Sequence, residues 1–319
     1  MISADAVPEA TASRERHADF LEIQAFKSLR RSVSFQEFLG DLKIANATEA
    51  IADAEGRDEE GQPDDRAESL AEAAFSEIDD RNRACGHDSK WYPFEVGGNT
   101  LTLREAAEAS LYTFLALLSW CGKDAGPSDM KGEKIFEEVC AKATEAYLGG
   151  PHRHVRSRVF GFPRLKHPKG FETALDALCK EIGEGDSHHA GREKLSHQKD
   201  AKLDVVAWRE FEDRRKGKLI VFGQCATGKN WSDKVMELPD PIDWWTTWIA
   251  DRPTVPPVKA FFVPHRVYQG DWFDVGVRGG LLYDRCRITS LASGMDPELQ
   301  NSWARWSSHV LLGIRKALR

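Results

Sequence analysis

The sequence lacks several patterns that would point directly to a class of protein. Its six cysteines form no CxxC pair, so free and mostly buried thiols are expected rather than a disulfide framework or a zinc site. No segment contains the roughly 18 consecutive apolar residues of a membrane-spanning helix. The N-terminal residues also lack the basic-then-apolar order of a signal peptide. A cytoplasmic protein that does not associate with membranes is therefore expected.

Positive charge is scarce over the chain as a whole, which carries a formal net charge of -7 at pH 7. This excludes a protein coated in basic surface, although a local basic patch remains compatible with it. One segment, 151–170, contains no acidic residue and has six basic ones: Arg153, Arg156, Arg158, Arg164, Lys166 and Lys169. Such a run suits contact with the phosphates of DNA, and an exposed interdomain loop is the alternative.

The chain has 319 residues, enough for two domains. Apolar residues at helical spacing predict a mainly helical N-terminal region over 1–150, interrupted by an acidic loop near 53–68. No catalytic group of residues stands out in this region. Over 151–319, strand-like and helical segments alternate, which predicts an α/β (α+β) domain. The expected strands are 203–208, 218–222, 258–263 and a fourth within 281–290, and the expected helices include 171–182 and 297–318.

The most informative segment is 202–234, which contains two of the expected strands and ends in a glycine-rich stretch. Gly223, Gly228 and Lys229 have the spacing of a phosphate-binding loop. However, Asn230 stands where the hydroxyl of Ser or Thr would bind magnesium, and no later apolar strand ends in a suitable Asp. A nucleotide hydrolase is therefore the less favoured interpretation.

The same segment also has the pattern of a metal-dependent nuclease. Asp204 stands at the start of the first strand and Gln224 at the end of the second. Two adjacent antiparallel strands would bring these side chains into one neighbourhood. Phosphodiester cleavage needs a metal ion held by oxygen ligands, a polarised water and a cation near the phosphate. The polar ends of this hairpin are candidates for part of that set.

In these residues the segment resembles the PD-(D/E)xK nuclease superfamily, which includes restriction endonucleases and anti-phage nucleases. Its members carry an Asp on one strand and an acid-x-Lys motif at the end of the next, and some have Gln in place of the acid. Asp204 matches the Asp, and Gln224 matches the acid. The resemblance implies a further acid, Glu184, from the helix before the hairpin, and a metal ligand in the backbone carbonyl of Cys225. It also implies a restriction-endonuclease-like mixed sheet flanked by helices, Mg²⁺ or Mn²⁺ as cofactor, and DNA as substrate.

The lysine position of the motif is occupied by Ala226. In some members of the superfamily the lysine comes from the following helix, so Lys229 is the expected replacement and Lys234 the alternative or a DNA contact. The predicted function is a Mg²⁺-dependent DNA endonuclease of restriction or anti-phage defence, with other defence subunits as further partners. If neither lysine reaches the site, the resemblance implies a catalytically decayed subunit that binds DNA or protein.

Overall fold

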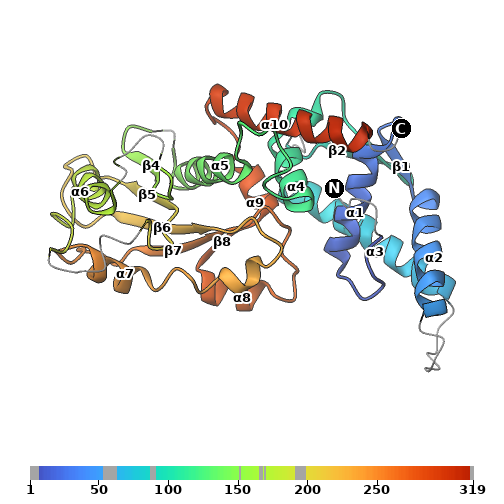
Figure 1. The fold of residues 1–319 in the computed structure, drawn as a ribbon, viewed down its shortest axis with the longest axis horizontal. Coiled ribbons are helices and arrows are strands. Elements are labelled where there is room, and N and C mark those ends of the chain that lie inside the picture. The colour runs from blue at the N-terminus through green and yellow to red at the C-terminus, as the bar shows by residue number, and fades with distance from the viewer. Residues whose placement is uncertain are drawn as a thin grey trace. The chain divides into compact units, whose positions relative to one another are not determined.

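The protein has an α+β fold with two separate sheets (Figure 1). The computed structural model describes residues 7–52, 63–86, 91–150, 152–164, 168, 170–190 and 199–316. The predicted fold class, a mixed sheet flanked by helices and preceded by a mainly helical region, is confirmed. Within these ranges, every helix is too short or too polar to cross a membrane.

The chain divides into two compact units whose boundary differs from the predicted position at residue 150. Unit 1 comprises Met1–Gly132, His265–Tyr268 and Asn301–Arg319, and unit 2 comprises Glu133–Pro264 and Gln269–Gln300. The fifth helix belongs to unit 2 because its residues pack on the second sheet, as the hydrogen bond of 2.6 Å from Ser157 Oγ to Glu145 Oε2 illustrates. Most of the last helix of the chain, from Asn301 onward, returns to unit 1. Packing between distant segments therefore decides the boundary.

Unit 1 is mainly helical and contains the smaller sheet. Its helices are α1 (Arg14–Lys27), α2 (Phe35–Ala52), α3 (Pro63–Ala84), η1 (Ala107–Ala109), α4 (Leu111–Cys121) and α10 (Pro297–Lys316). Its antiparallel sheet has the order β1 (Ser32–Ser34), β3 (Thr100–Leu103) and β2 (Phe94–Gly97). Of the predicted acidic loop, 53–62 lie outside the described residues. The remainder belongs to α3, where Asp64 and Asp65 lie in the first turn and complement the helix dipole.

Unit 2 contains the five-stranded mixed sheet. Its strands, in the spatial order of the sheet, are β4 (Val155–Val159), β5 (Val205–Arg209), β6 (Leu219–Cys225), β7 (Val258–Phe262) and β8 (Leu281–Tyr283). Its helices are α5 (Gly132–Tyr147), α6 (Phe171–Ile182), η3 (Trp231–Lys234), α7 (Pro241–Trp248), α8 (Trp272–Gly279) and α9 (Arg285–Ser290). β4, β5 and β6 are antiparallel, whereas β6, β7 and β8 run parallel. The structure matches the predicted strands within a few residues, but β4 was not expected in the basic segment.

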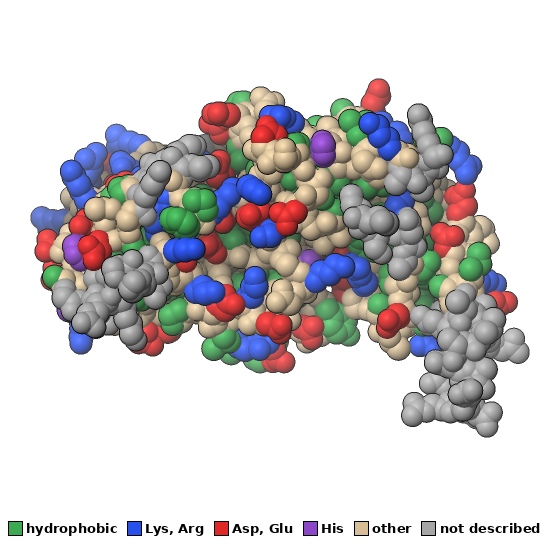
Figure 2. Space-filling model, viewed as in Figure 1, with side chains coloured by type: hydrophobic (Ala, Val, Ile, Leu, Met, Phe, Trp, Pro, Cys, Tyr) green, Lys and Arg blue, Asp and Glu red, His purple; other side chains and the backbone are tan. Residues whose placement is uncertain are grey.

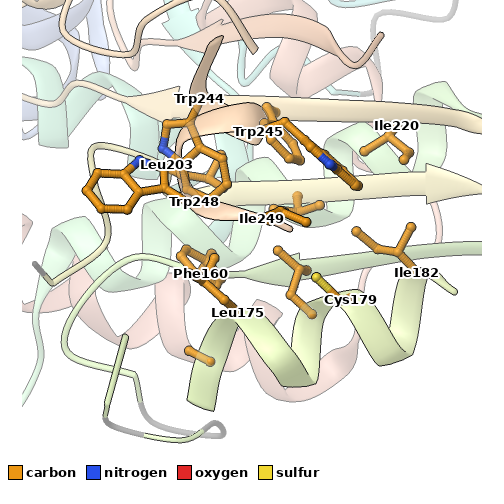
Figure 3. Close-up of a cluster of buried hydrophobic side chains, with 14 of the residues drawn as sticks. Phe160, Leu175, Cys179, Ile182, Leu203, Ile220, Trp244, Trp245, Trp248 and Ile249 are labelled. Carbon is orange, nitrogen blue, oxygen red and sulfur yellow. The ribbon is translucent and has the colours of Figure 1, made fainter. Parts of the chain in front are cut away.

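The core of unit 2 lies where α6 and α7 cover one face of this sheet (Figure 3). The buried residues of α6 recur every three or four positions, so the helix presents one apolar face to the strands. It ends at Gly183, whose left-handed backbone (φ 74°) lets its N–H bond the carbonyl of Cys179. From α7, Trp244, Trp245 and Trp248 complete the cluster. These tryptophans are packing residues, and they anchor the segments that lead to the end of the hairpin.

Candidate functional site

The ends of β5 and β6 bring two of the predicted site residues together. Asp204 immediately precedes β5, and Gln224 and Cys225 are the last residues of β6. The antiparallel register pairs Val205 with Gly223, which places Asp204 beside the end of β6. The backbone N–H of Cys225 donates a hydrogen bond of 2.8 Å to Asp204 Oδ2. One carboxylate is thereby fixed against the backbone that the resemblance assigns to metal binding.

A second carboxylate, Glu137 of α5, reaches the same place. Both acids converge on the backbone of Gly161, where a Cβ would lie 2.9 Å from Asp204 Oδ1 and 3.0 Å from Glu137 Oε2. The two oxygens are therefore at most 5.9 Å apart, the sum of those distances. Sequence analysis missed Glu137. The sequence offered only a weak signal for it, a charged residue next to Phe136 within the mainly helical region 1–150. In the structure the exposed fraction of Glu137 is only 7%.

These two carboxylates are buried near one another, so burial and mutual repulsion both oppose their ionisation. Burial, followed by repulsion from Glu137, raises the pKa of Asp204 to about 8. Burial also raises the pKa of Glu137 to about 7, although a hydrogen bond and the charge of Lys134 oppose the increase. Lys134 Nζ lies 2.9 and 2.8 Å from the two oxygens of Glu137. A bound cation would relieve the remaining cost of ionising both acids.

A pocket of about 440 Å³ opens beside Asp204. Its lining is polar and consists of Lys199, Asp200, Ala201, Lys202, Asp204, Gln224, Cys225, Lys234 and Glu237. Gln224 is buried, and its amide N–H group donates to Glu237 Oε2 at 3.2 Å. Its side-chain oxygen accepts a hydrogen bond of 3.0 Å from the N–H of Leu238. Gln224 thus holds the segment after β6 in place, and Glu237 is a pocket residue that the sequence analysis did not identify.

Glu184 lies at the opposite end of the hairpin, so its predicted place in the site is wrong. It is 2% exposed and accepts hydrogen bonds from the backbone N–H groups of Gly217 (2.7 Å) and Thr254 (3.2 Å). Lys218, whose N–H lies 3.4 Å from Glu184 Oε1, precedes Gln224 by six positions of extended chain, which is roughly 20 Å at about 3.3 Å per residue. Glu184 satisfies backbone donors where the hairpin turns, and the acid from a helix is Glu137 instead.

The two predicted lysines differ in position. Lys229 is exposed on the turn after β6 and is not among the residues that line the pocket. Lys234, at the end of η3, is partly buried and lines the pocket. The phosphate-loop interpretation also lacks its geometry. Gly223 is paired inside β6, and the four-residue 3-10 turn η3 follows where such a loop requires a long helix.

Of the basic segment 151–170, the structure describes 152–164, 168 and 170, which include β4. Arg153 pairs with Glu212 at 2.8 Å, and Arg158 pairs with Glu181 of α6. Arg164 is buried, with its guanidinium 4.6 Å from the ring centroid of Phe160. Arg156 is exposed on the edge strand β4, whereas Lys166 and Lys169 lie outside the described residues. Over the part of unit 2 that the structure describes, Figure 2 shows basic side chains with acidic ones among them.

The residues at the hairpin end fit a magnesium ion better than a transition metal. Among the described residues, no group of three or more His, Cys, Asp or Glu side chains could hold a metal ion. Magnesium, however, is normally bound by one or two carboxylates, with water and substrate phosphates as the other ligands. Glu137 and Asp204 supply that number of carboxylates, with oxygens at most 5.9 Å apart.

The pH dependence of stability tests this electrostatic description. In its folded state Asp204 has a pKa above its ordinary value of 3.8, so its favourable contribution is present below about pH 4 and is lost as the pH rises through about 8. Without divalent cations, Asp204→Asn is expected to stabilise the protein at pH 8 by more than about 1 kcal/mol, and much less at pH 4. Urea unfolding in EDTA at both pH values measures this difference. The exposed Asp251→Asn serves as control, and an identical pH dependence in both variants would contradict the description.

The arrangement of Glu137, Asp204 and the Cys225 backbone is the basis for a functional assignment, because similarity to other proteins supplies none. No protein-family model, curated protein or solved structure matches this chain.

Proposed function

We propose that unit 2 is a Mg²⁺-dependent DNA endonuclease of the PD-(D/E)xK type, acting in restriction or anti-phage defence. The observation that supports this proposal is the convergence of Glu137 and Asp204 on the end of the β5–β6 hairpin, beside the backbone of Cys225. The resemblance implied an Asp before one strand and an acid, Glu184, from the helix before the hairpin; in this proposal Glu137 of the earlier helix α5 takes the place of Glu184. Partner subunits and a cytoplasmic location remain predictions.

The proposed roles follow from the positions of the side chains. Glu137 and Asp204 would hold Mg²⁺ or Mn²⁺, and the carbonyl of Cys225 lies at the same strand end. When bound there, the metal ion supplies activation of a water molecule and neutralisation of charge on the phosphate. The lysines of the pocket lining attract the DNA backbone to a site whose acids would otherwise repel it. Gln224 keeps Glu237 and the segment after β6 in position through its two hydrogen bonds.

A decayed nuclease that binds DNA or protein is the second candidate. Ala226 stands at the lysine position, and it is buried with its N–H bonded to the carbonyl of Phe262. The side chain of Gln224 is already engaged on both of its polar groups. A decayed nuclease would bind DNA or protein without cleaving DNA, so one measurement of DNA cleavage distinguishes the two candidates.

That measurement is a cleavage assay on double- and single-stranded DNA with Mg²⁺, Mn²⁺, Ca²⁺ or EDTA. The proposal predicts cleavage of DNA by the wild-type protein with Mg²⁺ or Mn²⁺ and none with EDTA. Asp204→Ala, purified in parallel, excludes a contaminating nuclease. DNA binding in Ca²⁺ without cleavage in any metal would support the decayed candidate and reject the endonuclease.

A further inference from the structure

Lys202 lies in a short turn between Asp200 and Asp204, and the backbone of this turn is unusual. Ala201 and Lys202 are consecutive residues with left-handed φ values of 51° and 68°. Side chains with a Cβ rarely adopt this conformation, and two in succession persist only where the surroundings enforce them. The strained pair lies two residues before Asp204, which links it to the candidate site.

Several hydrogen bonds hold this turn. Asp200 Oδ1 accepts from the N–H of Lys202 at 3.0 Å, and Asp200 Oδ2 accepts from the N–H of Phe162 at 3.1 Å. The indole N–H of Trp244, a residue of the α7 core, donates to the carbonyl of Ala201 at 3.0 Å. The turn is therefore tied both to the core and to the segment that follows β4. This fixes the direction in which the Lys202 side chain leaves the backbone.

The ammonium group of Lys202 is oriented within the pocket. Its Nζ lies 2.9 Å from Glu237 Oε2, the same oxygen that receives the hydrogen bond of Gln224. Glu237 Oε2 thus links Lys202 and Gln224 by hydrogen bonds along the pocket that Asp204 also lines. The Lys202 side chain is still 57% exposed, so a phosphate oxygen can reach its ammonium from solvent.

The neighbouring lysines are less suited to the same task. Lys134 Nζ is bound by both oxygens of Glu137 and by the carbonyl of Phe162. Lys199 Nζ lies over the ring of Phe162, 5.4 Å from its centroid. Lys229 is exposed and does not line the pocket. Lys234 lines the pocket, but Lys202 is the lysine that a strained turn and an ion pair both orient there.

We propose that Lys202 is the catalytic cation of this site and replaces the lysine that is missing at Ala226, with Glu237 as its positioning residue. The assignment rests on the proposed endonuclease function. Hydrolysis adds one water across the phosphodiester: the P–O bond to the water oxygen forms and the P–O bond to the leaving oxygen breaks. A proton from the water ends on the leaving oxygen, so a phosphomonoester and a hydroxyl result. Lys202 keeps its proton throughout. Its ammonium donates a hydrogen bond to a non-bridging phosphate oxygen and stabilises the negative charge that develops there.

The test compares charge removal at three lysines by the same substitution. Lys202→Gln is expected to lower kcat for cleavage at least about 100-fold, the usual cost of removing one group that stabilises developing charge. Lys202→Arg is expected to have a kcat at least tenfold higher than that of Lys202→Gln. A purely structural role of the side chain does not predict this recovery. Glu237→Gln is expected to lower kcat about tenfold. Lys216→Gln, at the other end of the hairpin, is the control and should stay within about twofold.

Melting temperature and DNA binding in Ca²⁺ are measured for each variant, so that loss of fold is not mistaken for loss of catalysis. If the wild-type protein cleaves DNA, Lys202→Gln still cleaves it and Lys229→Gln does not, the assignment of Lys202 is overturned while the proposed function stands. If Arg fails to recover any activity in a folded Lys202 variant, a cationic role is also rejected. Absence of cleavage by the wild-type protein overturns the proposed function itself, and this assignment with it.

Discussion

Replacing Glu137 by glutamine is expected to lower DNA cleavage at least about 100-fold, because the amide removes a negative charge and one oxygen ligand from the proposed metal site. Asp204→Ala is expected to have an effect of at least this size. The same Glu→Gln change at Glu184 should leave the rate per folded molecule within about twofold. Single-turnover cleavage with Mg²⁺ measures all three. Calorimetric titration with Mn²⁺ provides a second readout, in which the variants at Glu137 and Asp204 lose affinity and Glu184→Gln does not.

The two glutamate variants differ also in stability, which makes them a matched pair. The buried carboxylate of Glu184 accepts hydrogen bonds from two backbone N–H groups, one on each of its oxygens, and glutamine offers only one acceptor oxygen. Glu184→Gln should therefore destabilise the protein by about 1–2 kcal/mol. Glu137→Gln should not, because neutralising this buried acid removes a repulsion with Asp204. A folded Glu184 variant without activity, beside an active Glu137 variant, would show that the wrong acid has been assigned.

Removing the buried guanidinium of Arg81 is expected to destabilise unit 1 by about 3–5 kcal/mol. Arg81 of α3 is fully buried, with Nη1 at 2.9 Å from Asp19 and 3.0 Å from Glu22. Its Nε lies 3.1 Å from Glu77, and its other nitrogen donates to the carbonyl of Glu15. Alanine at this position leaves these buried carboxylates without their common cation. Removing one member of a buried charge network lowers the free energy of unfolding by far more than the intact network contributes to it.

Urea unfolding followed by far-UV circular dichroism measures the loss in Arg81→Ala. Arg83→Ala, at an exposed position of the same helix, is the control and should change the free energy of unfolding by less than about 0.5 kcal/mol. Arg81→Met keeps much of the buried volume, yet it should be destabilised almost as strongly if charge is the cause. A loss of less than 1 kcal/mol in Arg81→Ala would indicate that the acids become solvated or protonated at little cost.

Local patterns in the sequence predicted most of the elements of unit 2. The apolar spacing of 171–182 predicts α6 with the bounds that the structure has, since a helix needs only its own periodicity and the glycine that ends it. Strand β4 escaped prediction because its outward positions carry Arg156 and Arg158, which suggested a DNA contact. The partner that identifies β4 as a strand is β5, which comes much later in the chain.

The sequence by itself determined that Asp204 and Gln224 lie near one another, because successive strands that pair antiparallel bring the start of the first beside the end of the second. Only the tertiary structure decided which helix supplies the second acid. Glu137 and Glu184 both belong to the region before the hairpin, and nothing local distinguishes them. The burial of whole helix faces against the sheet places α5 beside Asp204, whereas the residue after α6 reaches the opposite end of β6. The same holds for Lys202, whose orientation depends on Trp244 and Glu237 from later segments.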